Sequence, residues 1–187
     1  SPRSTEAGIK YLLLGAMVSG ILLFGMSLIY GAIGTLQFSQ IAAAITTHPP
    51  SVMFYIGLIF ILVALSFKIA VVPFHMWVPD VYEGAPTPVV AFFSIGTKMA
   101  GFAVLIRLYL TAFGSLQHEW GMLMAILSAT TIILGNLLAI PQTNIKRLLG
   151  YSSISHAGYI FMGLSASDSL GVGYILFYLV SYLFTNL

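Results

Sequence analysis

Long apolar runs, separated by short polar segments, make up most of the chain. Four runs reach the roughly 20 residues needed to cross a bilayer, at 11–33, 52–74, 89–113 and 121–140. Two weaker runs follow at 151–166 and 170–187. The pattern predicts an all-α polytopic membrane helix bundle, one transmembrane domain over residues 1–187. Its expected spans are about 8–33, 52–76, 88–113, 120–141, 145–166 and 170–187.

Residues at the edges of these runs support the segmentation. Ser4 and Thr5 can cap the first helix, and Asn144 can cap the fifth. Pro88 suits an early helical position, because its missing N–H would have no partner there. The segments 35–51, 75–88, 114–120, 142–150 and 167–169 are expected to be loops.

The second span carries a proline near its end. Pro73 follows Lys68 by five residues. A proline inside a helix removes one backbone hydrogen bond and displaces a carbonyl, so the helix is expected to kink or stop there. Broken membrane helices mark places where ions or protons are handled, because freed carbonyls can face a wet cavity.

Composition places the protein in lipid and excludes several kinds of site. Of 187 residues, 59% are hydrophobic and 6% charged, whereas about a quarter are charged in soluble domains. There is no cysteine, which excludes disulfides, iron–sulfur clusters and thiolate metal sites within this sequence. A net charge of +2 is too small to indicate a nucleic-acid partner.

The few charges predict a topology. With six spans, the basic residues outside the membrane core fall on one side, namely Arg3, Lys10, Lys146 and Arg147. The loops on the other side have no Lys or Arg, so the positive-inside rule places the N-terminus of this sequence in the cytoplasm. Lacking an initiator Met and stopping within an apolar run, the sequence is expected to be a fragment of a larger protein.

Two lysines within the apolar runs are the strongest candidates for function. Lys68 lies about 16 residues into its run and Lys98 about ten, roughly 24 Å and 15 Å at 1.5 Å per residue. Removal from water disfavours a charged amine, so each can release its proton and the two can form a relay through water. The alternatives are snorkelling of Lys68 to the headgroups and permanent pairing of Lys98 with a carboxylate.

Three further residues are candidates for the same path. His75, beside the proline break, can pass protons between Lys68 and water, or it can be an interfacial histidine satisfied by backbone groups. His156 lies in a run of hydroxyl residues that either hold water or bond neighbouring helices. Lys10 can line an access path, although Glu6 four residues earlier indicates a surface pair.

Other charged residues indicate structural roles. Asp80 and Glu83 can cap helices, gather protons or pair with Lys146 and Arg147, and pairing or capping is favoured. Arg107, near the far end of the third span, is expected to snorkel or anchor a loop. No phosphate loop, dinucleotide fingerprint, two-histidine metal spacing or nucleophile elbow is found in the sequence.

Two long motifs resemble a known family. Residues 67–89 read FKIAVVPFHMWVPDVYEGAPTPV, and residues 142–159 read QTNIKRLLGYSSISHAGY. Both resemble the antiporter-like subunits of respiratory complex I over essentially the whole chain, and most of all the branch of bacterial N subunits. The resemblance implies the antiporter-like inverted-repeat fold, with this sequence covering about the family's sixth to eleventh helices.

Site roles follow from the same resemblance. Lys68 would lie on the discontinuous seventh helix as the lysine of an input half-channel, and Lys98 on the eighth as the connecting lysine. Lys10 would be a further polar residue near the cytoplasmic side. The family's glutamate partner of Lys68 and its terminal lysine lie outside this sequence.

The resemblance also implies a function and its surroundings. It implies a proton-translocating subunit of NADH:quinone oxidoreductase in the bacterial inner membrane, among other membrane-arm subunits. No cofactor is expected in this chain, and NADH, flavin, iron–sulfur clusters and quinone are expected in partner subunits. The alternatives are a subunit of a multi-subunit sodium/proton antiporter, a purely structural bundle and electron donors other than NADH. The wording of residues 80–83 favours complex I.

Overall fold

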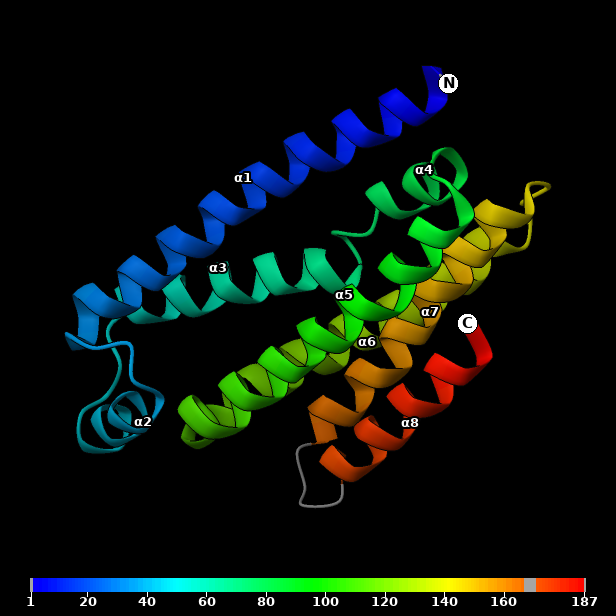
Figure 1. Cartoon of the computed structure of the whole chain (residues 1–187). Helices are drawn as coiled ribbons and strands as arrows, with labels where there is room; N and C mark the ends of the chain where they lie inside the picture. The colour runs from blue at the N-terminus through cyan, green and yellow to red at the C-terminus, as the bar shows by residue number, and fades with distance from the viewer. Residues whose placement is uncertain (1, 167–170, 187) are drawn as a thin grey trace.

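The protein is described by a computed structural model covering residues 2–166 and 171–186, without the Arg3 side chain. Within those ranges it is built of helices (Figure 1). The helices are α1 (Pro2–Ile33), α2 (Phe38–Thr47), α3 (Val52–Ile69), α4 (Trp77–Gly84), α5 (Thr87–Arg107), η1 (Leu108–Ala112), η2 (Gly114–Leu116), α6 (Gln117–Ala139), α7 (Ile145–Ala166) and α8 (Gly171–Asn186). The expected loop at 167–169 lies outside the described residues.

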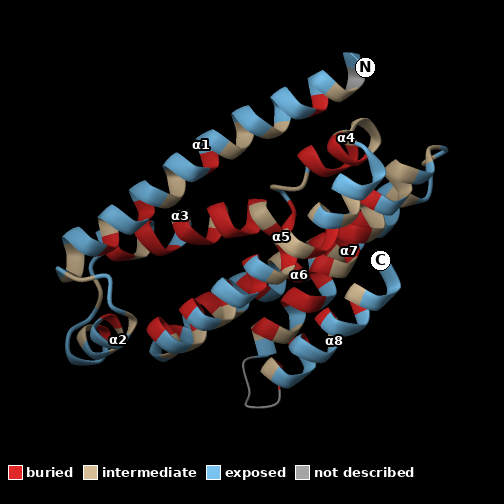
Figure 2. Ribbon diagram, viewed as in Figure 1, coloured by how far each residue is buried: buried red, intermediate tan, exposed pale blue. Residues whose placement is uncertain are grey.

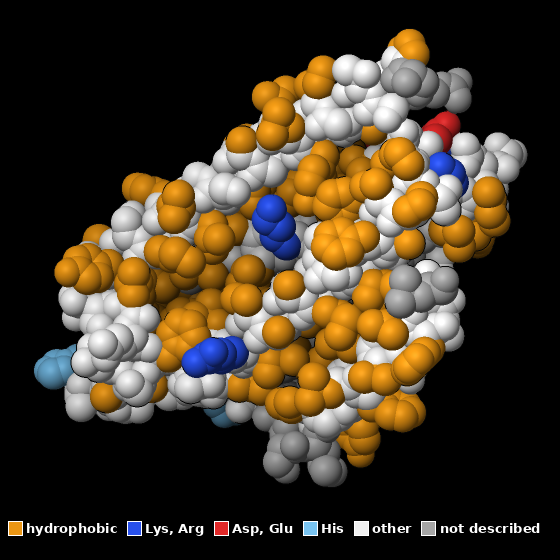
Figure 3. Space-filling model, in the orientation of Figure 1, with side chains coloured by type: hydrophobic (Ala, Val, Ile, Leu, Met, Phe, Trp, Pro, Cys, Tyr) orange, Lys and Arg blue, Asp and Glu red, His pale blue; other side chains and the backbone are white. Residues whose placement is uncertain are grey.

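Apolarity and length qualify four helical stretches of the described chain as membrane spans. They are Ser4–Ile33, Val52–Ile69, Thr87–Ala112 and Gly114–Ala139. The space-filling view agrees, because hydrophobic side chains spread over the visible face and charged ones are scattered (Figure 3). The all-α membrane bundle expected from the sequence is confirmed, whereas α7 and α8 stay predictions as spans.

Several expected boundaries were wrong. The segment 35–51 contains α2 and the segment 75–88 contains α4, because short amphipathic helices can be stable where they bury one face. The first helix starts at Pro2, so Ser4 and Thr5 lie inside it rather than at its cap. Asn144 does cap α7, and its Oδ1 accepts the Lys146 N–H at 2.9 Å.

The helices fall into two groups that meet at the break between α3 and α4. The helix α1 packs along α3 and α4, while α6, α7 and α8 pack in sequence on the other side (Figure 1). Burial is concentrated on α3, α4 and the inner faces of α5 and α7, and α1 is largely exposed (Figure 2). Glycine allows the closest helix contacts: Ser128 Oγ donates to the Gly158 carbonyl at 2.8 Å between α6 and α7.

Candidate functional site

Lys98 is the most deeply buried charged side chain of the described residues. It lies midway along α5 with 2% of its surface exposed. Its Nζ donates to the carbonyl oxygen of Ser153 and to Ser153 Oγ, the latter at 2.6 Å. Its Nζ also lies 5.5 Å from the centre of the Tyr182 ring. Among the described residues, Ser153 and Tyr182 thus make the polar and ring contacts of this amine, and no carboxylate pairs with it.

Ser153 connects Lys98 to two tyrosines. The Ser153 Oγ is 2.9 Å from the Tyr182 hydroxyl and 3.2 Å from the Tyr82 hydroxyl. These groups come from α4, α5, α7 and α8, so four helices meet at one buried serine. We call Lys98, Ser153, Tyr82 and Tyr182 the Lys98 cluster. Hydroxyls both donate and accept, so the cluster can pass a proton as well as hold one.

His156 is another neighbour of Tyr182. Its ring centre is 5.1 Å from that of Tyr182, and its Nδ1 is 2.7 Å from the Tyr178 hydroxyl. The ring is half-buried on α7, one turn after Ser153. Two of the five candidates, Lys98 and His156, are thus brought to the same tyrosine.

Lys68 occupies a different place. It lies half-buried in the last turn of α3, where the partial negative charge of a helix end favours a cation. Within residues 2–166 and 171–186 its ammonium makes no hydrogen bond or ion pair. The helices α3 and α5 touch where the Ile69 side chain packs over Gly101, one residue from Lys68 and three from Lys98. The structure puts the two lysines on adjoining helices, with no hydrogen bond between them.

The break follows Lys68 directly, and it starts before the proline. The helix ends at Ile69, and Ala70 takes a left-handed conformation with φ 65° and ψ 40°. The expected end at residue 76 was therefore wrong. The Val72–Pro73 peptide bond is cis.

Other parts of the fold satisfy the freed backbone groups. The Phe67 carbonyl accepts the Trp77 indole N–H at 3.0 Å, and the Val72 N–H donates to Thr131 Oγ1 at 3.0 Å. Val71 N–H donates to the Ser66 carbonyl at 2.9 Å. Irregular backbone is tolerated at membrane depth when protein groups satisfy it in this way.

His75 lies in the turn between α3 and α4, half-buried. Burial lowers the pKa of its imidazole below the ordinary value, although a hydrogen bond with the Pro73 backbone works in the opposite direction. A neutral imidazole can accept a proton on one nitrogen and donate from the other. No hydrogen bond to either lysine is found in the part of the chain that the structure describes.

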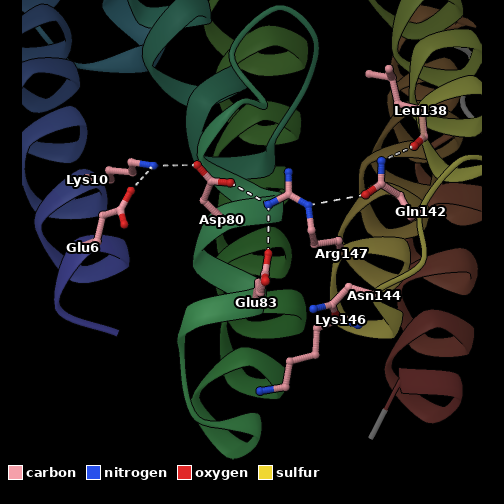
Figure 4. A network of polar contacts seen from close by, with 9 residues as sticks. All are labelled: Glu6, Lys10, Asp80, Glu83, Leu138, Gln142, Asn144, Lys146 and Arg147. Carbon is pink, nitrogen blue, oxygen red and sulfur yellow. Dashed lines mark hydrogen bonds and ion pairs between the residues drawn. The ribbon is translucent and has the colours of Figure 1, made fainter. Parts of the chain in front are cut away.

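Lys10 belongs to an ionic network at one end of the molecule (Figure 4). Its Nζ lies 2.7 Å from Glu6 Oε1 and 2.9 Å from Asp80 Oδ2. Arg147 Nη1 lies 2.8 Å from Asp80 Oδ1 and 3.0 Å from Glu83 Oε2. The network joins α1, α4 and α7, so Lys10 acts first as a structural pair, apart from the Lys98 cluster.

This network also settles the roles expected for the neighbouring charges. The pairing of Arg147 with Asp80 and Glu83 is confirmed, but Lys146 donates instead to the Ala85 carbonyl at 3.0 Å. At the opposite end, the Arg107 guanidinium stacks over the Phe38 ring at 5.8 Å. Arg107 was expected either to snorkel or to anchor a loop. Its contact with Phe38 agrees with the second role, because Phe38 begins α2 within the expected loop at 35–51.

Sequence reasoning missed two members of the Lys98 cluster. Tyr82 and Tyr182 come from segments that read as a loop and as a weak apolar run. Tyr182 offers a signal, a tyrosine in a mostly apolar stretch, since a buried phenol needs a hydrogen-bond partner. Tyr82 lies between Asp80 and Glu83 and offers no such signal. No group of three or more His, Asp or Glu positioned for a metal ion is found among the described residues.

Comparison with known sequences gives the family. The family model described as NADH:quinone oxidoreductase/Mrp antiporter, TM, matches residues 1–187. A curated relative from Moorella thermoacetica, named NADH-quinone oxidoreductase subunit N, is 52% identical over 185 residues, covering 99% of this chain and 39% of its own length. The relative of the same name from Desulforamulus reducens is 48% identical with the same coverage. The chain therefore spans about two fifths of these relatives.

Solved structures give the same assignment. Respiratory complex I from Thermus thermophilus with bound aureothin contains a chain that matches with a TM-score of 0.76 and 37% identity, over 100% of this chain and 40% of that one. The Mrp complex from Dietzia sp. DQ12-45-1b matches with a TM-score of 0.88 and 26% identity, over 97% and 33%. The chain belongs to the transmembrane family of NADH:quinone oxidoreductase and Mrp antiporter subunits.

Proposed function

We propose that this chain is the central part of a proton-translocating membrane subunit of an NADH:quinone oxidoreductase. The observation that carries the proposal is the Lys98 amine, which is 2% exposed and donates hydrogen bonds to the carbonyl and hydroxyl of Ser153 instead of to a carboxylate. An amine removed from water releases its proton more readily than an exposed one, because water no longer stabilises the charged form.

Lys68 supplies the second proton-binding group of the proposed path. It stands at the end of α3 beside the break, on the helix that packs against α5. A change of charge near Lys68 alters its proton affinity, and the amine of Lys98 responds to the charge on its neighbour. His75 serves exchange at the end of the molecule where α4 lies, and His156 extends the path beyond Tyr182.

In the proposed complex, the redox groups lie in partner subunits. In this proposal the chain performs no redox step and holds no cofactor. NADH, flavin, iron–sulfur clusters and quinone belong to other subunits, and other membrane-arm subunits surround this one. The relatives' names and the complex I neighbour support this placement. The proposed location is the bacterial inner membrane, with the α4 end facing the cytoplasm, where the basic residues gather.

Replacement of the lysines in the complete complex tests the function. In Lys98→Ala and Lys68→Ala, proton pumping per quinone reduced is expected to fall by at least about tenfold, since a positioned proton-transfer group contributes on the order of 10²-fold or more. Lys146→Ala is the matched control, because the Lys146 ammonium donates to a backbone carbonyl, that of Ala85, outside the Lys98 cluster. Normal pumping by both variants in an assembled complex would support a scaffold role instead.

A sodium/proton antiporter subunit is the second candidate. It is favoured by the TM-score of 0.88 to the Mrp complex, higher than the 0.76 to complex I. The sequence identities have the opposite order, 26% and 37%. Transport in vesicles separates the two: proton uptake driven by quinone reduction supports the oxidoreductase, whereas sodium-driven proton exchange without any electron donor supports the antiporter.

A further inference from the structure

Thr131 is a point at which α6 contacts the break between α3 and α4. Its side chain is buried, and its Oγ1 accepts the Val72 N–H at 3.0 Å. The same hydroxyl donates to the Leu127 carbonyl, one turn earlier on α6. That second bond fixes the direction of the hydroxyl, so a lone pair stays available to the break. Thr131 lies 59 residues from Val72 along the chain, so the contact joins two distant segments.

The face of α6 that carries Thr131 also packs on α7. Ser128, Thr131 and Gly135 are three and four residues apart and lie on one buried face. Ser128 Oγ donates to the Gly158 carbonyl of α7 at 2.8 Å. A Cβ at Gly135 would lie 2.5 Å from Ser155 Oγ, so the two helices are in close contact along their length (Figure 1). Because close-packed side chains resist sliding, α6 and α7 form one unit, which we call the α6–α7 pair.

The α6–α7 pair is bonded to both lysine sites. Ser153 on α7 accepts hydrogen bonds from Lys98 Nζ with its carbonyl and its hydroxyl. Thr131 on α6 holds Val72, which lies four residues after Lys68 and just beyond the end of α3. The bond from Val72 to Thr131 therefore fixes the end of α3 relative to the helix that carries the hydrogen-bond partner of Lys98.

We propose that Thr131 is a positioning residue for proton transfer by Lys68. Its hydroxyl ties the break to the α6–α7 pair, and so keeps Lys68 in a fixed place relative to Lys98 and Ser153. Without that hydroxyl the end of α3 is free to shift, and Lys68 shifts with it. The inference rests on the proposed proton transport, and it assigns a role in that transport to a residue that carries no charge.

Hydrogen exchange in the assembled complex tests whether Thr131 holds the break. Thr131→Val keeps the shape of the side chain and removes the hydroxyl. Amide exchange at Val72, followed by mass spectrometry of peptides covering 70–76, is expected to be at least about tenfold faster, because the N–H loses its acceptor. Thr131→Ser keeps the hydroxyl and is expected to stay within about twofold of the unmodified complex. Thr130→Val is the matched control, since Thr130 Oγ1 donates to carbonyls of its own helix.

Proton pumping then tests the positioning role. Thr131→Val is expected to lower pumping per quinone reduced at least about fivefold, because a reacting group misplaced by about 1 Å can lose up to 10²-fold in rate. Thr131→Ser and Thr130→Val are expected to pump normally. In a Lys68→Ala background, Thr131→Val is expected to cause no further loss, because the group that it positions is already absent. Thr131→Ala, which also lacks the hydroxyl, takes its place with the same expected results if Thr131→Val does not assemble.

Three results would overturn the inference. Unchanged exchange at Val72 in Thr131→Val would show that the hydroxyl does not hold the break. Faster exchange with normal pumping would show a bond that stabilises the fold without positioning Lys68. An equal loss of pumping with and without Lys68 would show that Thr131 acts elsewhere. Failure of the proposed function has a separate signature, because the Lys68→Ala and Lys98→Ala complexes would then pump normally whatever the exchange rates at the break.

Discussion

Lys98 and Lys10 have different roles although both are lysines, because their surroundings differ. Lys98 is bound by the neutral carbonyl and hydroxyl of Ser153 in the bundle interior. Lys10, 44% exposed, is paired with carboxylates at the surface. A carboxylate partner stabilises the ammonium form, whereas neutral partners leave both protonation states accessible. The distinction separates an exchangeable proton site from a structural ion pair.

Asp80 is the residue on which the ionic network depends. Partial burial works against its charged form, but hydrogen bonds from Lys10 and Arg147, together with their charges, outweigh that effect. The pKa of Asp80 is therefore held below its ordinary value of 3.8. A lowered pKa means that the folded state favours the carboxylate, so its stabilising contribution is full above pH 3.8 and is lost as the pH falls further.

Replacing Asp80 by Asn is expected to lower the thermal unfolding temperature of the complex at pH 7. The difference from the unmodified protein is expected to stay constant down to about pH 5 and to shrink as the pH falls below 3.8, because Asp80 then takes up a proton and the two proteins come to carry the same charge. Thermal unfolding of the detergent-solubilised complex across that range measures it. Glu119→Gln, at an exposed residue of α6, is the control. A difference that grows on acidification would contradict the assignment.

At the scale of an element, the break between α3 and α4 is fixed by contacts from elsewhere in the chain. Trp77 and Thr131 satisfy the backbone groups that the ended helix releases. Pro73 prevents a regular helix from continuing, but the end falls at Ile69, where Ala70 takes a left-handed conformation. The break is thereby a fixed feature that holds Lys68 at a helix end.

Because Ala70 is left-handed, glycine is expected to change the stability of the protein in opposite directions at Ala70 and at a regular helical alanine. Ala70→Gly is expected to stabilise the protein by about 1 kcal/mol, because glycine adopts positive φ without the steric cost of a Cβ. Ala64→Gly, inside α3 and equally buried at 1% exposure, is expected to destabilise it by about 1 kcal/mol. Thermal unfolding of the two complexes measures both. Destabilisation of equal size in both would refute the left-handed assignment at Ala70.

At the scale of the whole molecule, close approach of helix backbones sets the arrangement. In lipid, helices gain no hydrophobic stabilisation from meeting one another, so small residues and tight packing hold them together. The helices α1 and α3 cross at Gly25 and Gly57: a Cβ at Gly57 would lie 2.8 Å from the Gly25 carbonyl oxygen. The largely exposed α1 depends on this crossing and on the ionic network for its position.

Gly57→Ala is expected to destabilise the packing of α1 on α3 by about 1–3 kcal/mol, the usual cost of overpacking. The matched control is Gly20→Ala, since a Cβ at Gly20 meets nothing within 4 Å. Thermal unfolding and the yield of assembled complex measure the effect. A neutral Gly57→Ala variant would mean that α1 does not approach α3 as closely as described.

Sequence patterns predicted where the long helices lie better than where they end. They also identified the buried lysine but not the tyrosines near it. Long apolar runs and the pair Glu6–Lys10 follow from local spacing, and the pair Arg147–Asp80 follows from opposite charges expected on the same side of the membrane. The helices α2 and α4 were missed because their stability depends on burying one face against distant helices. Tyr182 was missed because it lies 84 residues from Lys98 along the chain (182 less 98).

The sequence by itself determined that this is a membrane helix bundle with two lysines in apolar surroundings, because apolar length and composition choose the solvent. Only the tertiary structure decided which groups surround those lysines, since hydrogen bonds between helices depend on how backbones pack. It placed Ser153 and Tyr182 around Lys98 and left Lys68 at a helix end.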